Sequence, residues 1–400
     1  MSAPHQRVGW FELFYDLVIV AAVSYTGHTF AADPSWGLGL WIAAWTLIMF
    51  VLWLLTTLGN NLVPSDSAPR RMLGLLQMLA IVIAALGTVA DEGLSNATGF
   101  GALAVAFGSV CATYVLLRPA DPGVRRHVRV LAWASGAAAT ILALGLLLPD
   151  SAEWTVTGAP TWIIAVGVAA AAVPLFVVVG RCSALVNAEH LGERLGQLVI
   201  IVLGEAFIGL VTTLGGLSAI PNPVYFVLTF LVVFAIWTLY FSSVMPAGVP
   251  TSPGRLRAWL LMHVLLMFGA IGAAAVFSSL TLVPFGDESA DLIQGAEWTT
   301  LPLFFVLVAL ASMTWIAGGR LTVLIRIYLA AAAVLLVMAG AGLVLTSGGS
   351  AWENVSGSVI VVGVALASVR ISRPYSPTEV EDVREGAGGS PPRGSGPSPS

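Results

Sequence analysis

The chain contains 400 residues, of which 58% are hydrophobic and 10% are charged, and its formal net charge is −4. Because an average soluble domain carries roughly 25% charged residues, this composition excludes ordinary soluble enzymes, disordered chains and disulfide-stapled domains. The 17 basic residues are all arginine and are too sparse for a groove that follows a phosphate backbone, so nucleic acid is excluded as a partner. The composition predicts an integral membrane protein whose surroundings are the lipid bilayer.

Twelve apolar segments approach the roughly 20 residues that a helix needs to cross about 30 Å of hydrocarbon. The first contains Glu12 and Asp16 and lacks a clear small-residue cleavage site, so we interpret it as a retained span rather than a signal peptide. The sequence therefore predicts an all-α, polytopic transmembrane helical bundle. In chain order, the predicted spans are 10–31, 36–58, 72–90, 97–117, 128–148, 161–180, 195–215, 224–244, 258–283, 300–317, 321–345 and 355–370.

The arginines fall in alternate connections between these spans. They occur before the first span, at every second connection and from Arg370 onward, whereas the intervening loops carry acids such as Asp91 and Glu92. Because cytoplasmic loops are enriched in basic residues, this pattern predicts that both termini are cytoplasmic. From 373 to 400 the chain is rich in Pro, Gly and Ser, which predicts a disordered cytoplasmic tail.

The two halves of the chain resemble each other around their first spans. Glu12 aligns with Glu193, and the aliphatic residues that follow each acid keep the same register. Trp53 aligns with Trp237 after a short shift. Six spans per half would give both halves the same orientation, so we expect a parallel 6+6 internal repeat of 1–180 and 181–372. Chance similarity between aliphatic stretches is the alternative interpretation.

Few ionisable side chains lie inside the spans. Each costs about 2.5–3.5 kcal/mol near the membrane centre and usually faces a cavity or a partner. Glu12 and Asp16 are one helical turn apart on one face, so both are charged only if a cation or an arginine lies nearby. Glu205 follows Glu193 by about 18 Å of helix, which places it near the midplane. His263 lies about 9 Å into the ninth span.

These residues allow two interpretations. In the first, they form a polar track for ions or protons at the interface between the repeats. The candidate transport or ion-binding residues are Glu12, Asp16, Glu193, Arg194, Glu205 and His263. In the second, Glu12, Glu193 and Arg194 close interhelical salt bridges or cap helix N-termini.

Other chemistry has little support in the sequence. His190 and Glu193 form a lone His-x-x-Glu pair without a second cluster at metal-ligand spacing, and no Walker-type glycine loop occurs, so we expect no metal and no cofactor. Cys111 and Cys182 are expected to be small buried hydrophobic residues rather than a disulfide. The small residues of 269–273 permit close helix packing, either within the chain or in a homo-oligomer.

Two motifs are similar to those of a known family. The run 10–20, Trp-Phe-Glu-Leu-Phe-Tyr-Asp-Leu-Val-Ile-Val, resembles the opening motif of the low temperature requirement protein A (LtrA) family. The run 190–205 resembles that family's second motif, a His-x-x-Glu-Arg sequence and an aliphatic run that ends in Leu-Gly-Glu. The resemblance extends to about 372 and implies a multi-pass protein of the bacterial plasma membrane. The corresponding motif positions are Glu12, Asp16, His190, Glu193, Arg194, Gly204 and Glu205.

The sequence leaves more than one function open. Twelve spans, a repeat and buried acids favour a transporter or channel-like protein for an ion, a proton or a small solute. The alternative is an intramembrane enzyme that acts on a lipid or isoprenoid substrate through carboxylate and histidine acid–base groups. The missing metal motif argues against this enzyme, so activity of this kind is uncertain. A scaffold or sensor is a third alternative.

Overall fold

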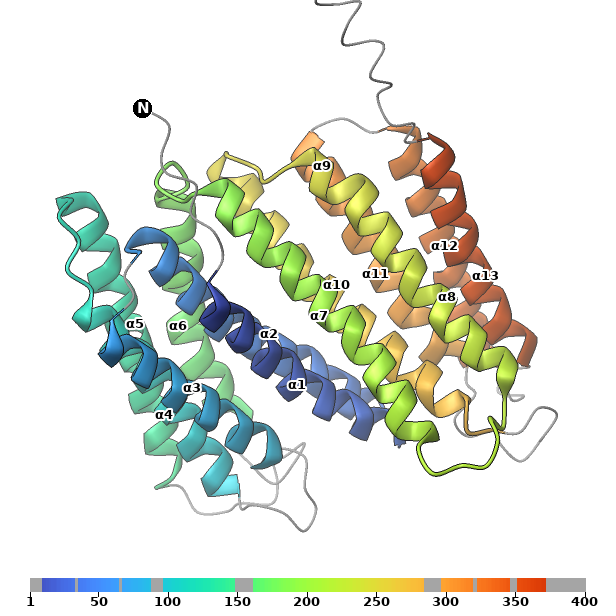
Figure 1. Cartoon of the computed structure of the whole chain (residues 1–400), viewed down its shortest axis with the longest axis horizontal. Coiled ribbons are helices and arrows are strands. Elements are labelled where there is room, and N and C mark those ends of the chain that lie inside the picture. Colours follow the sequence, from blue (N-terminus) through green and yellow to red (C-terminus); the bar gives the residue numbers. More distant parts are fainter. Residues whose placement is uncertain are drawn as a thin grey trace, which may run out of the picture.

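The protein is a bundle of long α-helices (Figure 1). The computed structural model describes residues 9–32, 35–64, 67–87, 96–147, 161–283, 296–318, 322–345 and 351–371, and these ranges contain no β-strand. The tail that we expect over 373–400 lies outside them. The helices are α1 (Trp10–Ala32), α2 (Trp36–Leu62), α3 (Ala68–Gly87), α4 (Asn96–Leu116), α5 (Pro122–Gly145), α6 (Thr161–Arg181), α7 (Ala188–Leu214), α8 (Pro223–Leu239), α9 (Met245–Ala247), α10 (Pro253–Leu280), α11 (Ala296–Gly318), α12 (Val323–Leu345) and α13 (Ala351–Ile371).

These helices confirm the all-α, polytopic bundle. The π-helical segment η2 (Tyr240–Val244) joins α8 to the short α9, so Pro223–Ala247 is one continuous helix. Counted in this way, each of the twelve predicted spans has a helix over it in the described ranges. Ten of these helices are long and apolar enough to cross a membrane. The other two are α1, which carries Glu12 and Asp16, and α13, whose apolar stretch is shorter.

Several helices begin earlier than the apolar segments that predicted them. Asp121 accepts a hydrogen bond from the backbone N–H of Gly123, and Asn187 accepts one from that of His190. Such caps satisfy N–H groups that the first helical turn leaves without partners. Polar first turns are therefore helical although hydropathy does not reveal them, and α7 starts at Ala188 rather than near 195.

Four helices form the centre of the bundle. In Figure 1, α1, α2, α7 and α10 lie between α3–α6 on one side and α8 and α11–α13 on the other. The largest fully buried side chains include Trp45 and Trp53 of α2 and Trp259 of α10. Contacts of α1 and α2 with α7 and α10 join the N-terminal and C-terminal halves of the chain.

The outer faces of the helices are apolar. Leu40, Val211, Val337 and Leu366 are all at least 65% exposed. A continuous surface of this kind is covered by lipid in a membrane protein, because a soluble protein rarely exposes one. The small-residue stretch 269–273 packs within the chain, since a Cβ on Gly269 would lie 2.8 Å from the backbone oxygen of Pro302 in α11.

Candidate functional site

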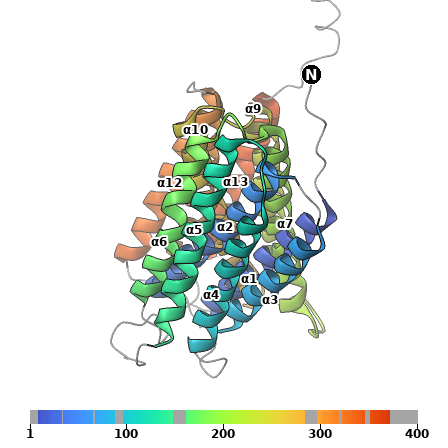
Figure 2. The same ribbon diagram turned by 90° about the vertical axis from the view of Figure 1, so that its left-hand side faces the viewer.

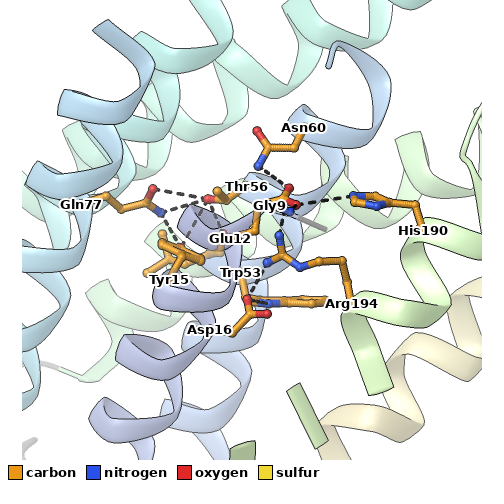
Figure 3. Close-up of polar contacts among 11 residues, drawn as sticks. Gly9, Glu12, Tyr15, Asp16, Trp53, Thr56, Asn60, Gln77, His190 and Arg194 are labelled. Atoms are coloured by element: carbon orange, nitrogen blue, oxygen red, sulfur yellow. Dashed lines mark hydrogen bonds and ion pairs between the residues drawn. The ribbon is translucent and has the colours of Figure 1, made fainter. Parts of the chain in front are cut away.

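Arg194 of α7 lies between two carboxylates of α1 (Figure 3). Its side chain is fully buried, with Nη1 2.9 Å from Oε1 of Glu12 and Nη2 2.5 Å from Oδ1 of Asp16. Glu12 and Asp16 are one helical turn apart, so α1 presents both to the same neighbour. One cation thus joins two anions across the boundary between the halves of the chain.

Trp53 of α2 completes the surroundings of Asp16. Its indole Nε1 donates a hydrogen bond to Oδ1 at 2.7 Å, and the Arg194 guanidinium lies 5.7 Å from its ring centre. Oδ2 of Asp16 and Nε of Arg194 have no hydrogen-bond partner among the described residues, and Nη1 of Arg194 lies close to Glu12 without hydrogen-bond alignment. Buried polar atoms left unpaired cost about 1–3 kcal/mol each, so this pair has unused capacity to bind water or a solute group.

Glu12 is held from three further directions. Asn60 of α2 donates a hydrogen bond to Oε1 at 2.8 Å, and Nε2 of His190 lies 3.8 Å from Oε2. The carboxylate also accepts the backbone N–H of Gly9 at 3.1 Å, which caps the start of α1. Arg70 of α3 donates to Oδ1 of Asn60 at 2.6 Å and so orients that amide. Glu12 therefore acts both as a helix cap and as an interhelical ion-pair partner.

A neutral hydrogen-bond cluster lies beside the charges (Figure 3). Gln77 of α3 donates a hydrogen bond to the Tyr15 hydroxyl at 2.7 Å, and the Thr56 hydroxyl lies 3.3 Å from that oxygen and 3.3 Å from Oε1 of Gln77. Tyr15 and Gln77 are buried. These bonds connect α1, α2 and α3 and hold the face of α1 that carries Asp16.

Asn61 and Asn187 tie the start of α7 to the end of α2. The Asn61 amide donates to the backbone oxygen of Asn187 at 3.1 Å and accepts from its backbone N–H at 2.8 Å. The Asn187 side chain meanwhile caps α7 through His190. Arg194 lies less than two turns further along α7. The paired contact therefore fixes the position of the helix that carries Arg194 relative to α2.

A second polar site lies farther along the same helices. Ser24 and His28 of α1, Glu205 of α7 and Ser278 of α10 line a pocket with room for about one water molecule. The hydroxyls of Ser24 and Ser278 are buried and lack hydrogen-bond partners among the described residues, and no partner of Glu205 is found there either. His28 packs over Gly209, where an added Cβ would lie 2.7 Å from Cε1 of its ring.

The two sites lie along one i, i+4 ridge of α1. Glu12, Asp16, Ser24 and His28 are spaced by four or eight residues, so they follow a ridge that winds around α1 by about 40° for every four residues. Helix α1 contacts α7 along its length. We call this contact between α1 and α7 the α1–α7 seam. Val20 lies between the two sites and is fully buried, and Leu198 and Val202 of α7 are buried at the corresponding level. A dry layer therefore separates the charged cluster from the Glu205 pocket.

The structure distributes the predicted residues over four places. Glu12, Asp16, His190 and Arg194 come together, and Glu205 lies in the separate pocket. Glu193 is exposed and has no partner among the described residues, although its neighbour Arg194 is fully buried. Gly204, a motif position, has no atom within 4 Å of where a Cβ would lie, so close packing does not explain a glycine there.

His263 belongs to a different cluster in the C-terminal half. Its Nε2 lies 3.1 Å from the Tyr240 hydroxyl and its Nδ1 lies 2.9 Å from the backbone oxygen of Trp259. Tyr240 begins the π-helical segment η2, and Ser243 in the same segment accepts a hydrogen bond from Tyr328. No hydrogen bond or ion pair between the described residues connects this cluster with Arg194, so His263 is not part of the charged group.

Sequence reasoning missed the role of Trp53 beside the charges. In the sequence, Trp53 stands out only because it aligns with Trp237 of the second half. In the structure, Trp53 is buried and donates a hydrogen bond to Asp16, whereas Trp237 is 43% exposed and stacks on Phe234. A tryptophan within an apolar segment is a usable signal, because a buried indole N–H needs an acceptor and few acids lie in the neighbouring spans. The contacts of Asn187 had no such local signal.

The cysteines and the possible metal ligands can be compared with the expectations for the described part of the chain. Cys182 is buried, as predicted, whereas Cys111 is only half-buried, and both are free thiols. Across the described ranges, no three His, Cys, Asp or Glu side chains are grouped so that they could hold a metal ion.

Comparisons with known proteins agree with this picture of a membrane bundle. A family model described as bacterial low temperature requirement A protein (LtrA) matches residues 7–367. The chain is also similar to a protein of Rhizobium meliloti (strain 1021) named uncharacterized protein RA0937, with 26% identity over 240 residues. That match covers 58% of this chain and 57% of the relative, so it spans little more than half of either. No solved structure matches.

Proposed function

The chain belongs to the bacterial LtrA family of membrane proteins, and we propose that it is a transporter or channel-like protein that moves protons or a small cation along the α1–α7 seam. Ionisable side chains inside membrane bundles commonly mark the paths of ions and protons. Arg194, which contacts Asp16, precedes Glu205 by 11 residues on α7, so about 17 Å of helix separates the two sites of the seam.

The observation that carries the proposal is the incomplete pairing of Asp16 and Arg194. Both side chains are fully buried, yet Oδ2 and Nε lack partners among the described residues. A purely structural ion pair is most stable when its remaining atoms are also bonded, because each desolvated charge needs full compensation. Unused atoms in such a pair suit a site that exchanges its partner for a proton, water or a cation.

The dry layer around Val20 supports gated rather than continuous passage. A hydrophobic constriction blocks ions until it becomes wet or until the helices on its two sides move apart. In our proposal, neutralisation of Asp16 weakens its attraction to Arg194 and loosens the contact of α1 with α7. The halves 1–180 and 181–372, which we propose to be parallel repeats, would then move relative to each other.

Flux measurements in proteoliposomes test the proposal. Wild type would be reconstituted with an internal pH dye under imposed proton, sodium or potassium gradients, beside Asp16→Asn, Glu205→Gln and Glu193→Gln. We expect at least a tenfold loss of flux in the first two variants. Glu193→Gln is the matched control, because Glu193 lies on the same helix as Glu205 but is exposed and unpartnered among the described residues.

The outcomes separate the alternatives. Folded wild type that moves none of the three cations would contradict ion transport, and extracts from cells with and without the gene would then be searched for an altered lipid or organic solute. Equal flux in wild type and both seam variants would show that transport does not use these carboxylates.

A further inference from the structure

A groove with a volume of about 700 Å³ lies between α4 and α5, outside the α1–α7 seam. Figure 2 faces this side of the molecule, where α4 and α5 run next to each other. The volume of this groove falls within the roughly 300–1,000 Å³ that is usual for small-molecule sites. The proposed transport path does not use any residue that lines it.

Two arginines line one end of the groove. Arg125 and Arg129 of α5 are one helical turn apart, and both are exposed. Arg125 is oriented by the backbone oxygens of Pro119 and Ala120, at 3.4 and 3.2 Å. The nearby acid Asp121 binds the backbone N–H of its own helix, and neither arginine has a carboxylate partner in the described part of the chain. The groove therefore ends in two cations that no acid of the described ranges neutralises.

The rest of the groove is apolar and is kept open by small side chains. Gly136, Ala137 and Thr140 of α5 line it, and a Cβ on Gly136 would lie 3.2 Å from Sγ of Cys111 on α4. Trp133 borders the groove and is 76% exposed. An apolar groove along a lipid-facing helix accommodates a hydrocarbon chain more readily than a polar solute.

The position of the arginines near the start of α5 leads us to expect them at the depth of lipid headgroups. Arg129 is about 10 Å from the start of α5, so the guanidinium groups flank the boundary between hydrocarbon and water while the small residues lie farther inside. The arginine-rich connection before α5 is also on the side that we predict to be cytoplasmic, where anionic lipids attract basic residues.

We propose that this groove binds an anionic phospholipid of the bilayer, with its phosphate on Arg125 and Arg129 and one acyl chain along Gly136, Ala137 and Thr140. The charge favours lipid over a second copy of the chain. Two copies related by symmetry would bring the same cations together, and unpaired charges in an interface weaken it.

The test uses delipidated full-length protein in detergent, with phosphatidylglycerol as the probe and phosphatidylethanolamine as its counterpart of no net charge. Native mass spectrometry would measure lipid binding to wild type, to the double variant Arg125→Gln/Arg129→Gln and to Arg126→Gln. Arg126 is the matched control, because it is exposed on the same helix but does not line the groove. We expect about 30-fold weaker phosphatidylglycerol binding in the double variant, since each basic residue near anionic lipid contributes a factor of about five.

A second pair of variants tests the groove itself. Ala137→Trp should fill the groove and reduce phosphatidylglycerol binding, whereas Ala143→Trp, at an exposed position on the same helix outside the groove, should not. Undiminished binding in both the arginine double variant and Ala137→Trp would overturn the proposal. So would binding of phosphatidylethanolamine as tight as that of phosphatidylglycerol, or loss of a dimer in Ala137→Trp without any change in lipid binding.

Discussion

Two regions of the α1–α7 seam each hold a carboxylate, but only one of the two carboxylates has bonding partners among the described residues. Asp16 is fully buried, and a cation and an indole N–H both contact its Oδ1. Glu205 is half-buried beside a water-sized pocket, and no partner of it is found among the described residues. An acid in an apolar helix can therefore be a link between helices at one level and an isolated group beside a small pocket at another. The contrast predicts that Asp16 affects both stability and transport, whereas Glu205 affects mainly transport.

Removal of the shared cation should have the largest effect. Arg194→Gln leaves two carboxylates of α1 without their cation, and breaking a buried pair costs about 3–5 kcal/mol. We expect the unfolding temperature in detergent to fall more than in any other variant discussed. The double variant Asp16→Asn/Arg194→Gln should recover part of the loss, and a double variant that is no more stable than Arg194→Gln would contradict the pairing.

Loss of the indole N–H donor of Trp53 should have the second-largest effect on stability. Trp53→Phe removes a hydrogen bond to a buried carboxylate, for which we expect a loss of about 1.5–3 kcal/mol in the free energy of unfolding. Trp45→Phe is the matched control, because Nε1 of the buried Trp45 donates to the neutral backbone oxygen of Ala22 at 3.0 Å, a bond worth about 0.5–1.5 kcal/mol. Equal losses in chemical unfolding would indicate that Asp16 is uncharged in the folded protein.

Two glycines of α7 test the packing around the Glu205 pocket. Gly204→Ala should be neutral or stabilise by up to about 1 kcal/mol, because nothing lies near its added Cβ and alanine favours a helix. Gly209→Ala should lack this gain, since the Cβ would displace the ring of His28 and narrow the pocket. The unfolding temperatures of the two variants, measured under the same conditions, test this difference. An equal gain in stability at both positions would show that the His28 side chain moves freely.

Neutralisation of Glu205 should affect stability least. Glu205→Gln breaks no ion pair within the described ranges and relieves the desolvation of a charge, so we expect a change within about 0.5 kcal/mol. Circular dichroism during heating would measure it. A destabilisation as large as that of Arg194→Gln would mean that Glu205 has a structural partner and would remove the contrast with Asp16.

Much of the architecture follows from local properties of the sequence. The low charge content and twelve apolar segments predict the helical bundle, and the spacing of Glu12 and Asp16 places both on one face of α1. Helix starts were less predictable, because the caps Asp121 and Asn187 lie in polar segments that hydropathy treats as loops. The parallel repeat stays a prediction, and the unequal surroundings of Trp53 and Trp237 give it no support.

The sequence by itself determined that acids lie within a membrane bundle and which of them share a helical face, because helical periodicity depends only on neighbouring residues. Only the tertiary structure decided their partners. Arg194 is buried between Glu12 and Asp16 while the adjacent Glu193 faces outward, and His263 pairs with Tyr240 far from both. Local spacing does not specify such partners, because they depend on how helices distant in the sequence pack against one another.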